Sequence, residues 1–258
     1  FGALLRLADI DADKMAEIIA VLDYYTIYAY DADTQAARWD FPVVMDVQSL
    51  YVGDVDNDTV QEVVVGDGQW GYVHAYDSLT LLEEWSIANP EHGVNEMAFA
   101  DPDEDGLTEV LWGAGWTSSG PDYLYVGDTI SETIEWQSTD TGGPLSAVDT
   151  GDVDNDGSDE IVMVSYDSDS GYDSGIIFIY DAETYALEWQ SEPLLGGQAQ
   201  PGAEALALAD VDEDGVLEIV IATAVSSEGV ILAYDGISHN LDWQTINYEG
   251  ATFSALAI

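Results

Sequence analysis

A short acidic segment that recurs five times constrains this chain more than any other feature. The clearest copy spans residues 151–163, GDVDNDGSDEIVM, and carries acids at Asp152, Asp154, Asp156 and Glu160. These acids hold positions one, three, five and nine of a loop. Alternate residues of a tight loop point the same way, so the carboxylates can converge on one hard cation. A glycine at position six permits the positive φ that the reversal needs.

The same spacing predicts metal ligands in all five copies, with position seven contributing a backbone carbonyl and the glutamate closing the shell. The predicted ligands are Asp9, Asp11, Asp13, Met15 and Glu17; Asp54, Asp56, Asp58, Val60 and Glu62; Asp101, Asp103, Asp105, Leu107 and Glu109; Asp152, Asp154, Asp156, Ser158 and Glu160; and Asp210, Asp212, Asp214, Val216 and Glu218. An EF-hand instead has a bidentate glutamate at position twelve and flanking helices. Position twelve here is Ala20, Val65, Trp112, Met163 or Ile221, so no EF-hand is expected.

A second signature follows each loop at a similar distance. A tryptophan stands eight residues after an aspartate, and a hydroxyl residue stands three after that aspartate. The aspartates are Asp31, Asp77, Asp128, Asp181 and Asp235, the hydroxyl residues are Thr34, Thr80, Ser131, Thr184 and Ser238, and the tryptophans are Trp39, Trp85, Trp136, Trp189 and Trp243. The aspartate and hydroxyl predict a hydrogen-bonded turn between two strands. The tryptophan is expected to fill the gap between neighbouring sheets.

These periods predict an all-β chain, a β-propeller of four-stranded blades. Successive loops begin 45, 47, 51 and 58 residues apart, which is a blade length. The expected repeats are 1–45, 46–93, 94–144, 145–202 and 203–252, with residues 253–258 starting another blade. Since a closed five-bladed ring has no place for that sixth strand, we expect a larger ring of six to eight blades. Further segments of the chain, or other copies, would complete it.

The charge balance excludes several kinds of partner. The chain has 52 acids against three bases, and no Lys or Arg occurs from Phe41 to Ile258. Nucleic acids and anionic membranes both need basic patches, so neither is an expected partner. Five divalent ions would move the formal charge from −49 to −39, which still favours a saline setting or an acidic exported protein. Cysteine is absent, so disulfides and thiolate metal sites play no part.

Targeting signals are also absent from the printed sequence. No run of 18 apolar residues exists, so we expect no membrane-spanning helix. The chain has no initiator methionine and no signal-peptide pattern, and it starts within an expected strand, which favours a processed or partial product.

The acidic loops followed by β-prone residues resemble the FG-GAP and VCBS repeats of integrin-α-like propellers, over essentially the whole chain. The resemblance implies up to five calcium ions, one in each blade loop, and an extracellular or cell-surface module for adhesion or assembly. Two loops depart from the pattern at position six, with Lys14 in loop one and Thr59 in loop two. We expect these two sites to bind calcium most weakly.

The aspartate–hydroxyl–tryptophan segment is also similar to the repeat of pyrroloquinoline-quinone propellers. In those repeats a glycine normally follows the hydroxyl residue, whereas this chain has Gln35, Leu81, Glu132, Tyr185 and His239. We therefore interpret the segment as shared blade architecture and expect no cofactor site. Asn57 begins a glycosylation sequon, but it lies within loop two.

Two functions of different class remain open. The first is a non-catalytic calcium-binding module that binds a protein or glycan on a cell surface or in an assembly. Trp70, Trp112 and Trp116 lie outside the tryptophan period and could stack on sugars, although core packing is the simpler expectation. The second is a calcium-dependent polysaccharide lyase or glycoside hydrolase. Such an enzyme needs a cationic Lys or Arg to hold an acidic sugar or to act as base, and the chain has neither after Arg38.

Overall fold

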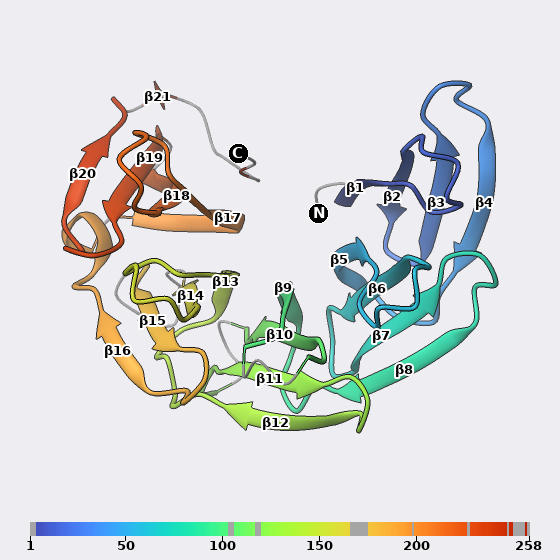
Figure 1. The fold of residues 1–258 in the computed structure, drawn as a ribbon, viewed down its shortest axis with the longest axis horizontal. Helices are drawn as coiled ribbons and strands as arrows, with labels where there is room; N and C mark the ends of the chain where they lie inside the picture. Colours follow the sequence, from blue (N-terminus) through green and yellow to red (C-terminus); the bar gives the residue numbers. More distant parts are fainter. Residues whose placement is uncertain are drawn as a thin grey trace.

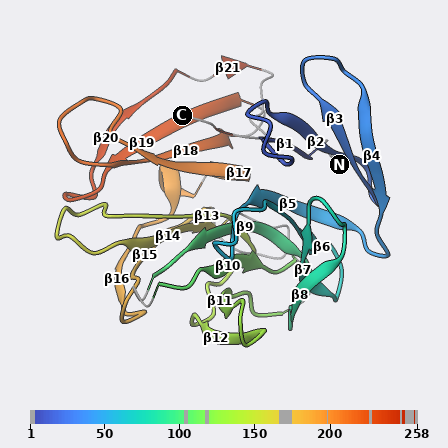
Figure 2. The same ribbon diagram turned by 45° about the vertical axis from the view of Figure 1, so that its right-hand side comes forward.

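The computed structural model describes residues 4–102, 106–116, 120–165, 175–197, 199–225, 228–246, 248–249 and 256. They form five antiparallel sheets of four consecutive strands, here called blades one to five, arranged around a common centre (Figure 1). Figure 2 shows the same sheets standing side by side from a second direction. The predicted all-β propeller of four-stranded blades is confirmed.

The strands follow the expected order within each blade. Blade one contains β1 (Leu4–Ala8), β2 (Glu17–Asp23), β3 (Thr26–Asp31) and β4 (Ala37–Pro42), and blade two contains β5 (Val47–Gly53), β6 (Glu62–Asp67), β7 (Tyr72–Asp77) and β8 (Glu83–Ala88). Blade three contains β9 (Val94–Ala100), β10 (Glu109–Ala114), β11 (Leu124–Asp128) and β12 (Thr133–Gln137), and blade four contains β13 (Leu145–Gly151), β14 (Glu160–Ser165), β15 (Ile177–Asp181) and β16 (Leu187–Gln190). Blade five contains β17 (Ala199–Ala209), β18 (Glu218–Val225), β19 (Glu228–Asp235) and β20 (Leu241–Gln244), and β21 (Tyr248–Glu249) also pairs with β19.

Each blade places its first strand toward the centre and its fourth strand at the rim (Figure 1). The second strands are the most deeply buried, and every residue of β10 and β14 is buried. Strands packed on both faces read as continuous apolar runs, and these two fit that pattern. A 3₁₀ turn, Leu194–Gly196, is the only helical element in the described part of the chain. No helix there has the length and apolar character to cross a membrane.

The hydrophobic core lies between neighbouring blades. Each cluster of buried side chains joins two consecutive blades, from blades one and two to blades four and five. The periodic tryptophans contribute to these contacts as predicted: the Trp136 ring lies 5.3 Å from that of Tyr180, and the Trp189 ring lies 4.5 Å from that of His239. Trp243 differs, with 41% of its surface exposed, because no described blade packs against its outer side.

The ring is open between blades one and five (Figure 1). Strands β1 and β17 belong to separate sheets, and no described strand joins them. The expected sixth strand at residues 253–258 lies outside the described residues except for Leu256. A ring of six to eight blades therefore stays a prediction.

Candidate metal centres

The acidic loops occupy the same place in every blade, between the first and second strands. Successive strands run antiparallel, so the connections of a blade alternate between the two faces of the ring. The acidic loops therefore share one face with the aspartate turns that join the third and fourth strands. The connections from the second to the third strand, and those between blades, lie on the opposite face.

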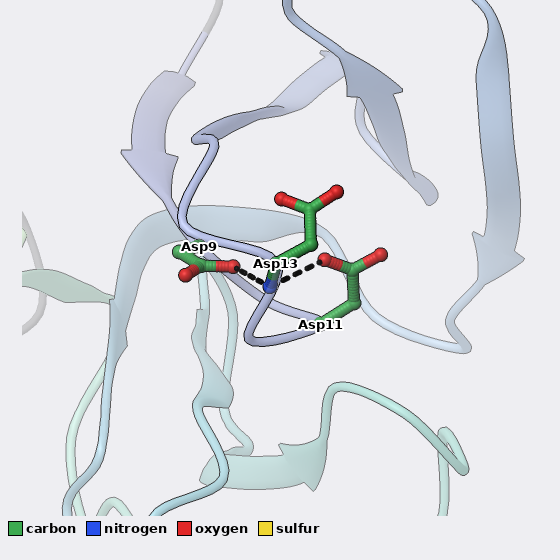
Figure 3. A group of neighbouring side chains, drawn as sticks. All are labelled: Asp9, Asp11 and Asp13. Carbon is green, nitrogen blue, oxygen red and sulfur yellow. Dashed lines mark hydrogen bonds between the residues drawn. The ribbon is translucent and has the colours of Figure 1, made fainter.

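Backbone N–H groups donate to the first acids of loops one, two, four and five, whose residues are all described. In loop one, the Asp13 N–H donates to Oδ1 of Asp9 at 3.1 Å and to Oδ1 of Asp11 at 3.3 Å (Figure 3). Loops two and five repeat both bonds. The residue at position seven donates its N–H to the acid at position five in four loops, through Met15, Val60, Ser158 and Val216. These four loops are thus preshaped before any metal binds.

Position six has a positive φ in every loop, as the glycine pattern predicts. Gly106, Gly157 and Gly215 have φ of 88°, 98° and 93°. Lys14 and Thr59 adopt the same conformation, with φ of 73° and 78°, although their side chains make it less favourable. All five residues donate their N–H to the position-one aspartate, at 2.8 to 3.2 Å. The two departures from the motif are therefore strained copies of the same loop.

The position-nine glutamate begins the second strand and reaches back into the loop. Its Oε2 accepts the N–H of position two, at 3.1 Å in loop one and at 2.8, 2.8 and 2.7 Å in loops two, four and five. Glu17, Glu62, Glu109, Glu160 and Glu218 are all at most 3% exposed. A buried carboxylate needs compensating partners, because its desolvation costs several kcal/mol.

Carboxylate oxygens lack hydrogen-bond partners in three of the described loops, loops two, four and five. Oε1 of Glu62 and Oε1 of Glu218 are buried and have no hydrogen-bond partner among the described residues, and Oδ1 of Asp152 is in the same state. Burial raises the pKa of Glu62 to about 8 and that of Glu160 to about 7, and neighbouring aspartates add to both shifts. A divalent cation would supply the missing charge and coordination, so these residues fit calcium.

Four loops bring three acidic ligand atoms within 4.8 Å of one another. The groups are Asp9, Asp11 and Asp13; Asp54, Asp56 and Asp58; Asp152, Asp154 and Glu160; and Asp210, Asp212 and Glu218. In loop three, Asp103 and Asp105 lie outside the described residues, while Asp101, Leu107 and Glu109 are described. Calcium binding at every predicted ligand stays a prediction.

The aspartate turns match their predicted role. The N–H three residues after the aspartate donates to its Oδ1 in all five blades. The fourth residue after each aspartate has a positive φ between 56° and 60°, at Gln35, Leu81, Glu132, Tyr185 and His239. The five residues at this position all carry a Cβ atom, so each adopts a backbone conformation that favours glycine.

Sequence reasoning missed Arg38, which lies on the outermost strand of blade one. Its guanidinium contacts Asp11, and it lies 3.0 Å from Oε1 of Glu17 and 3.2 Å from Oδ2 of Asp31. The signal was available, because Arg38 directly precedes Trp39. The residues before the other four tryptophans are all acids: Glu84, Glu135, Glu188 and Asp242.

One protein-family model matches part of the chain. Residues 152–221 match the family model of the FG-GAP-like repeat, and this segment contains loops four and five. The predicted FG-GAP repeat is therefore confirmed in this part of the chain. No curated protein sequence matches the chain.

Solved structures resemble the whole chain. A crystal of BBS1N in complex with ARL6DN, soaked with lead, matches 97% of this chain and 69% of its own at 13% identity, with a TM-score of 0.65. A mercury-soaked crystal of that complex matches 96% and 69% at 12% identity, with a TM-score of 0.66. A chain of the Mitotic Checkpoint Complex matches 98% and 68% at 14% identity, with a TM-score of 0.64. At these identities the likeness shows the fold, a β-propeller.

Proposed function

We propose that this chain is a non-catalytic, extracellular propeller module that binds up to five calcium ions, one in each acidic loop. Its role is to bind a protein or glycan on a cell surface or in an assembly. The observation that carries the proposal is the buried carboxylate oxygen of Glu62 and of Glu218, each left without a partner beside further acids in the described part of the chain. Calcium accepts such oxygen-rich, irregular shells.

Extracellular calcium suits loops of this kind. Modules that work outside the cell bind calcium with dissociation constants of about 10⁻⁴ to 10⁻³ M. Four acids within one loop repel one another strongly without an ion, so filling the loops stabilises the fold. The propeller would then reach full stability only where calcium is plentiful.

Two features support a binding role. The printed descriptions of two similar structures name a complex and an assembly of proteins, so a protein partner is consistent with this fold. Trp70 and Trp116 are 62% and 44% exposed, and their rings lie 5.7 and 5.3 Å from the ring of His92. These three residues lie on the face opposite the acidic loops, where they offer an apolar contact for a protein or a sugar. Trp112, in contrast, is fully buried.

The lysine and arginine side chains available to hold an acidic sugar are three, and two of them form ion pairs. Arg6 lies 3.6 Å from Glu96, and Arg38 binds the acids of loop one. Lys14 is the remaining base of the chain, and it lies within the same loop. This distribution favours the binding module over a polysaccharide lyase or hydrolase that must hold an acidic sugar.

The proposal is tested by calorimetric titration of the full chain with calcium, alongside an activity assay. We expect several ions to bind with dissociation constants near 10⁻⁴ to 10⁻³ M, in the range of extracellular modules. Incubation with polygalacturonate and calcium should release neither unsaturated products nor new reducing ends. Absence of calcium binding, or binding saturated at submicromolar calcium, would contradict the proposed module. Cleavage of the polysaccharide would favour the enzyme.

A further inference from the structure

Arg38 shows where a cation sits beside the acidic loop of blade one. Its Nη2 lies 3.0 Å from Oε1 of the fully buried Glu17, 3.2 Å from Oδ2 of Asp31 and 3.6 Å from Oδ2 of Asp13. The other oxygen of Glu17 accepts the Ile10 N–H. Both oxygens of this buried glutamate are therefore satisfied, one by the backbone and one by a guanidinium.

Blade five has the same frame without the guanidinium. Oε2 of Glu218 accepts the Val211 N–H at 2.7 Å, as Oε2 of Glu17 accepts that of Ile10. Oε1 of Glu218, the counterpart of the oxygen that binds Arg38, is buried and has no partner among the described residues. Glu218 is only 1% exposed, so solvent does not replace the missing partner.

In blade five an aspartate, Asp242, occupies the sequence position that Arg38 has in blade one. Asp242 precedes Trp243 as Arg38 precedes Trp39. Ligand atoms of Glu218, Asp235 and Asp242 lie within 4.8 Å of one another. Asp235 uses Oδ1 for the Ser238 N–H, just as Asp31 uses Oδ1 for that of Thr34, which leaves Oδ2 as the counterpart of the oxygen that contacts Arg38.

We propose that Glu218, Asp235 and Asp242 form a second divalent-cation site in blade five, in the position that the Arg38 guanidinium fills in blade one. Three carboxylates and no nitrogen or sulfur ligand select a hard cation, and the exposed Asp242 leaves room for water in the shell. Asp235 and Asp242 lie outside the repeated loop motif. Because Glu218 also belongs to loop five, the inference rests on the proposed function through this one residue.

Blades two and four lack an equivalent convergence. Their counterparts are Glu62, Asp77 and Glu84, and Glu160, Asp181 and Glu188, with the longer glutamate before the tryptophan. Neither set brings its ligand atoms within 4.8 Å in the described part of the chain. In blade three, Glu109, Asp128 and Glu135 likewise form no such group among the described residues, so the second site is assigned to blade five alone.

The test counts calcium ions bound to the full chain by equilibrium dialysis at saturating calcium. Asp242→Asn and Asp242→Arg should each bind one ion fewer than the wild type. Glu183→Gln and Glu183→Arg are the matched controls, because Glu183 is an exposed acid of the blade-four turn outside every acidic group. Both controls should keep the wild-type count. Asp242 is exposed on the rim strand, so its variants should retain the wild-type circular dichroism spectrum.

Two further variants sharpen the result. Arg38→Asp removes the guanidinium and restores an acid, so it should bind one ion more than the wild type. Asp242→Arg should melt above the wild type in chelator, because it supplies an internal cation. An unchanged ion count in Asp242→Asn or in Arg38→Asp would overturn the inference.

Asp210→Asn distinguishes the loop-five calcium site from the second site, because Asp210 belongs only to the loop. A lower count in Asp210→Asn with an unchanged count in Asp242→Asn would retain the loop site and reject the second site. The reverse pattern would reject the loop site and retain the second.

Discussion

The backbone N–H of Val55, at position two of its acidic loop, donates to Oε2 of Glu62, at position nine, at 2.8 Å. This bond ties the start of the loop to the start of the second strand. The glutamate therefore closes the loop with one oxygen, and its second oxygen is buried without a hydrogen-bond partner among the described residues, where a cation could bind it. That division explains why a long side chain stands at position nine where shorter aspartates occupy positions one, three and five.

Replacing Glu62 with glutamine should have opposite effects with and without calcium. The amide oxygen can still accept the Val55 N–H, while the buried charge is lost. In chelator we expect Glu62→Gln to stabilise the fold by roughly 1–3 kcal/mol, because a shift of one pKa unit corresponds to about 1.4 kcal/mol. In saturating calcium the variant should be less stable than the wild type. Urea unfolding in both buffers measures the two differences, and a change of the same sign in both would refute the role of Glu62 as a metal ligand.

A second prediction concerns pH and Glu91, which lies outside the acidic loops. Burial raises the pKa of Glu91 to about 7, the nearby Asp122 and Asp140 add to the shift, and the Tyr125 hydroxyl donates to Oε1 and opposes it. Between about pH 4.5 and 7, Glu91 is therefore protonated in the folded chain and ionised in the unfolded chain. The contribution of Glu91 to the free energy of unfolding is fully present below about pH 4.5 and is lost as the pH rises toward 7.

The variant Glu91→Gln should remove this pH dependence. We expect it to gain up to about 3 kcal/mol on the wild type at pH 8 and little at pH 4.5. Unfolding curves at the two pH values in chelator test the prediction. Equal differences at both pH values would show that Glu91 titrates normally.

A third prediction tests the packing of blade four against blade five. A Cβ atom at Gly236 would lie 2.2 Å from the carbonyl oxygen of Val153 in loop four and 2.6 Å from that of Leu217. Backbone atoms cannot yield as a flexible side chain can. Gly236→Ala should therefore destabilise the chain by roughly 1–3 kcal/mol.

The matched position in blade two is Ser78, whose hydroxyl donates to the Ile10 carbonyl of loop one at 3.1 Å. Ser78→Ala should cost only about 1 kcal/mol, the value of one hydrogen bond. Thermal melting of both variants compares the two interfaces. A Gly236→Ala variant as stable as the wild type would contradict the close approach.

A fourth prediction concerns the backbone of the aspartate turns. Gln35 is exposed and has φ of 60°, a conformation that costs a residue with a Cβ about 1 kcal/mol. Gln35→Gly should stabilise the chain by about that amount relative to Gln35→Ala, which retains the strain. Chemical denaturation measures the difference, and equal stabilities of the two variants would show that the turn is unstrained.

The repeated parts of this molecule were predicted well from the sequence, because five copies of the same spacing agree with only one arrangement of strands and loops. Five loops and five turns at fixed offsets imply identical blades, and the positive φ at position six follows from glycine in three of them. The roles of Asp242 and Arg38 were missed because each contacts a residue on another strand of its blade. Asp242 is 24 residues from Glu218, and Arg38 is 21 residues from Glu17. The exposure of Trp243 was also missed, since a periodic pattern gives every copy the same neighbours and does not mark the open side of the ring.

The central claim is that divalent ions neutralise the acidic loops and thereby stabilise the propeller. Differential scanning calorimetry of the full chain in chelator and in millimolar calcium, at constant ionic strength, tests it most directly. We expect chelation to lower the Tm by about 10 °C or more, since each kcal/mol shifts the Tm of a chain this long by about 2–4 °C and several sites contribute. Added calcium should restore the original Tm. The same Tm in both buffers would contradict the claim.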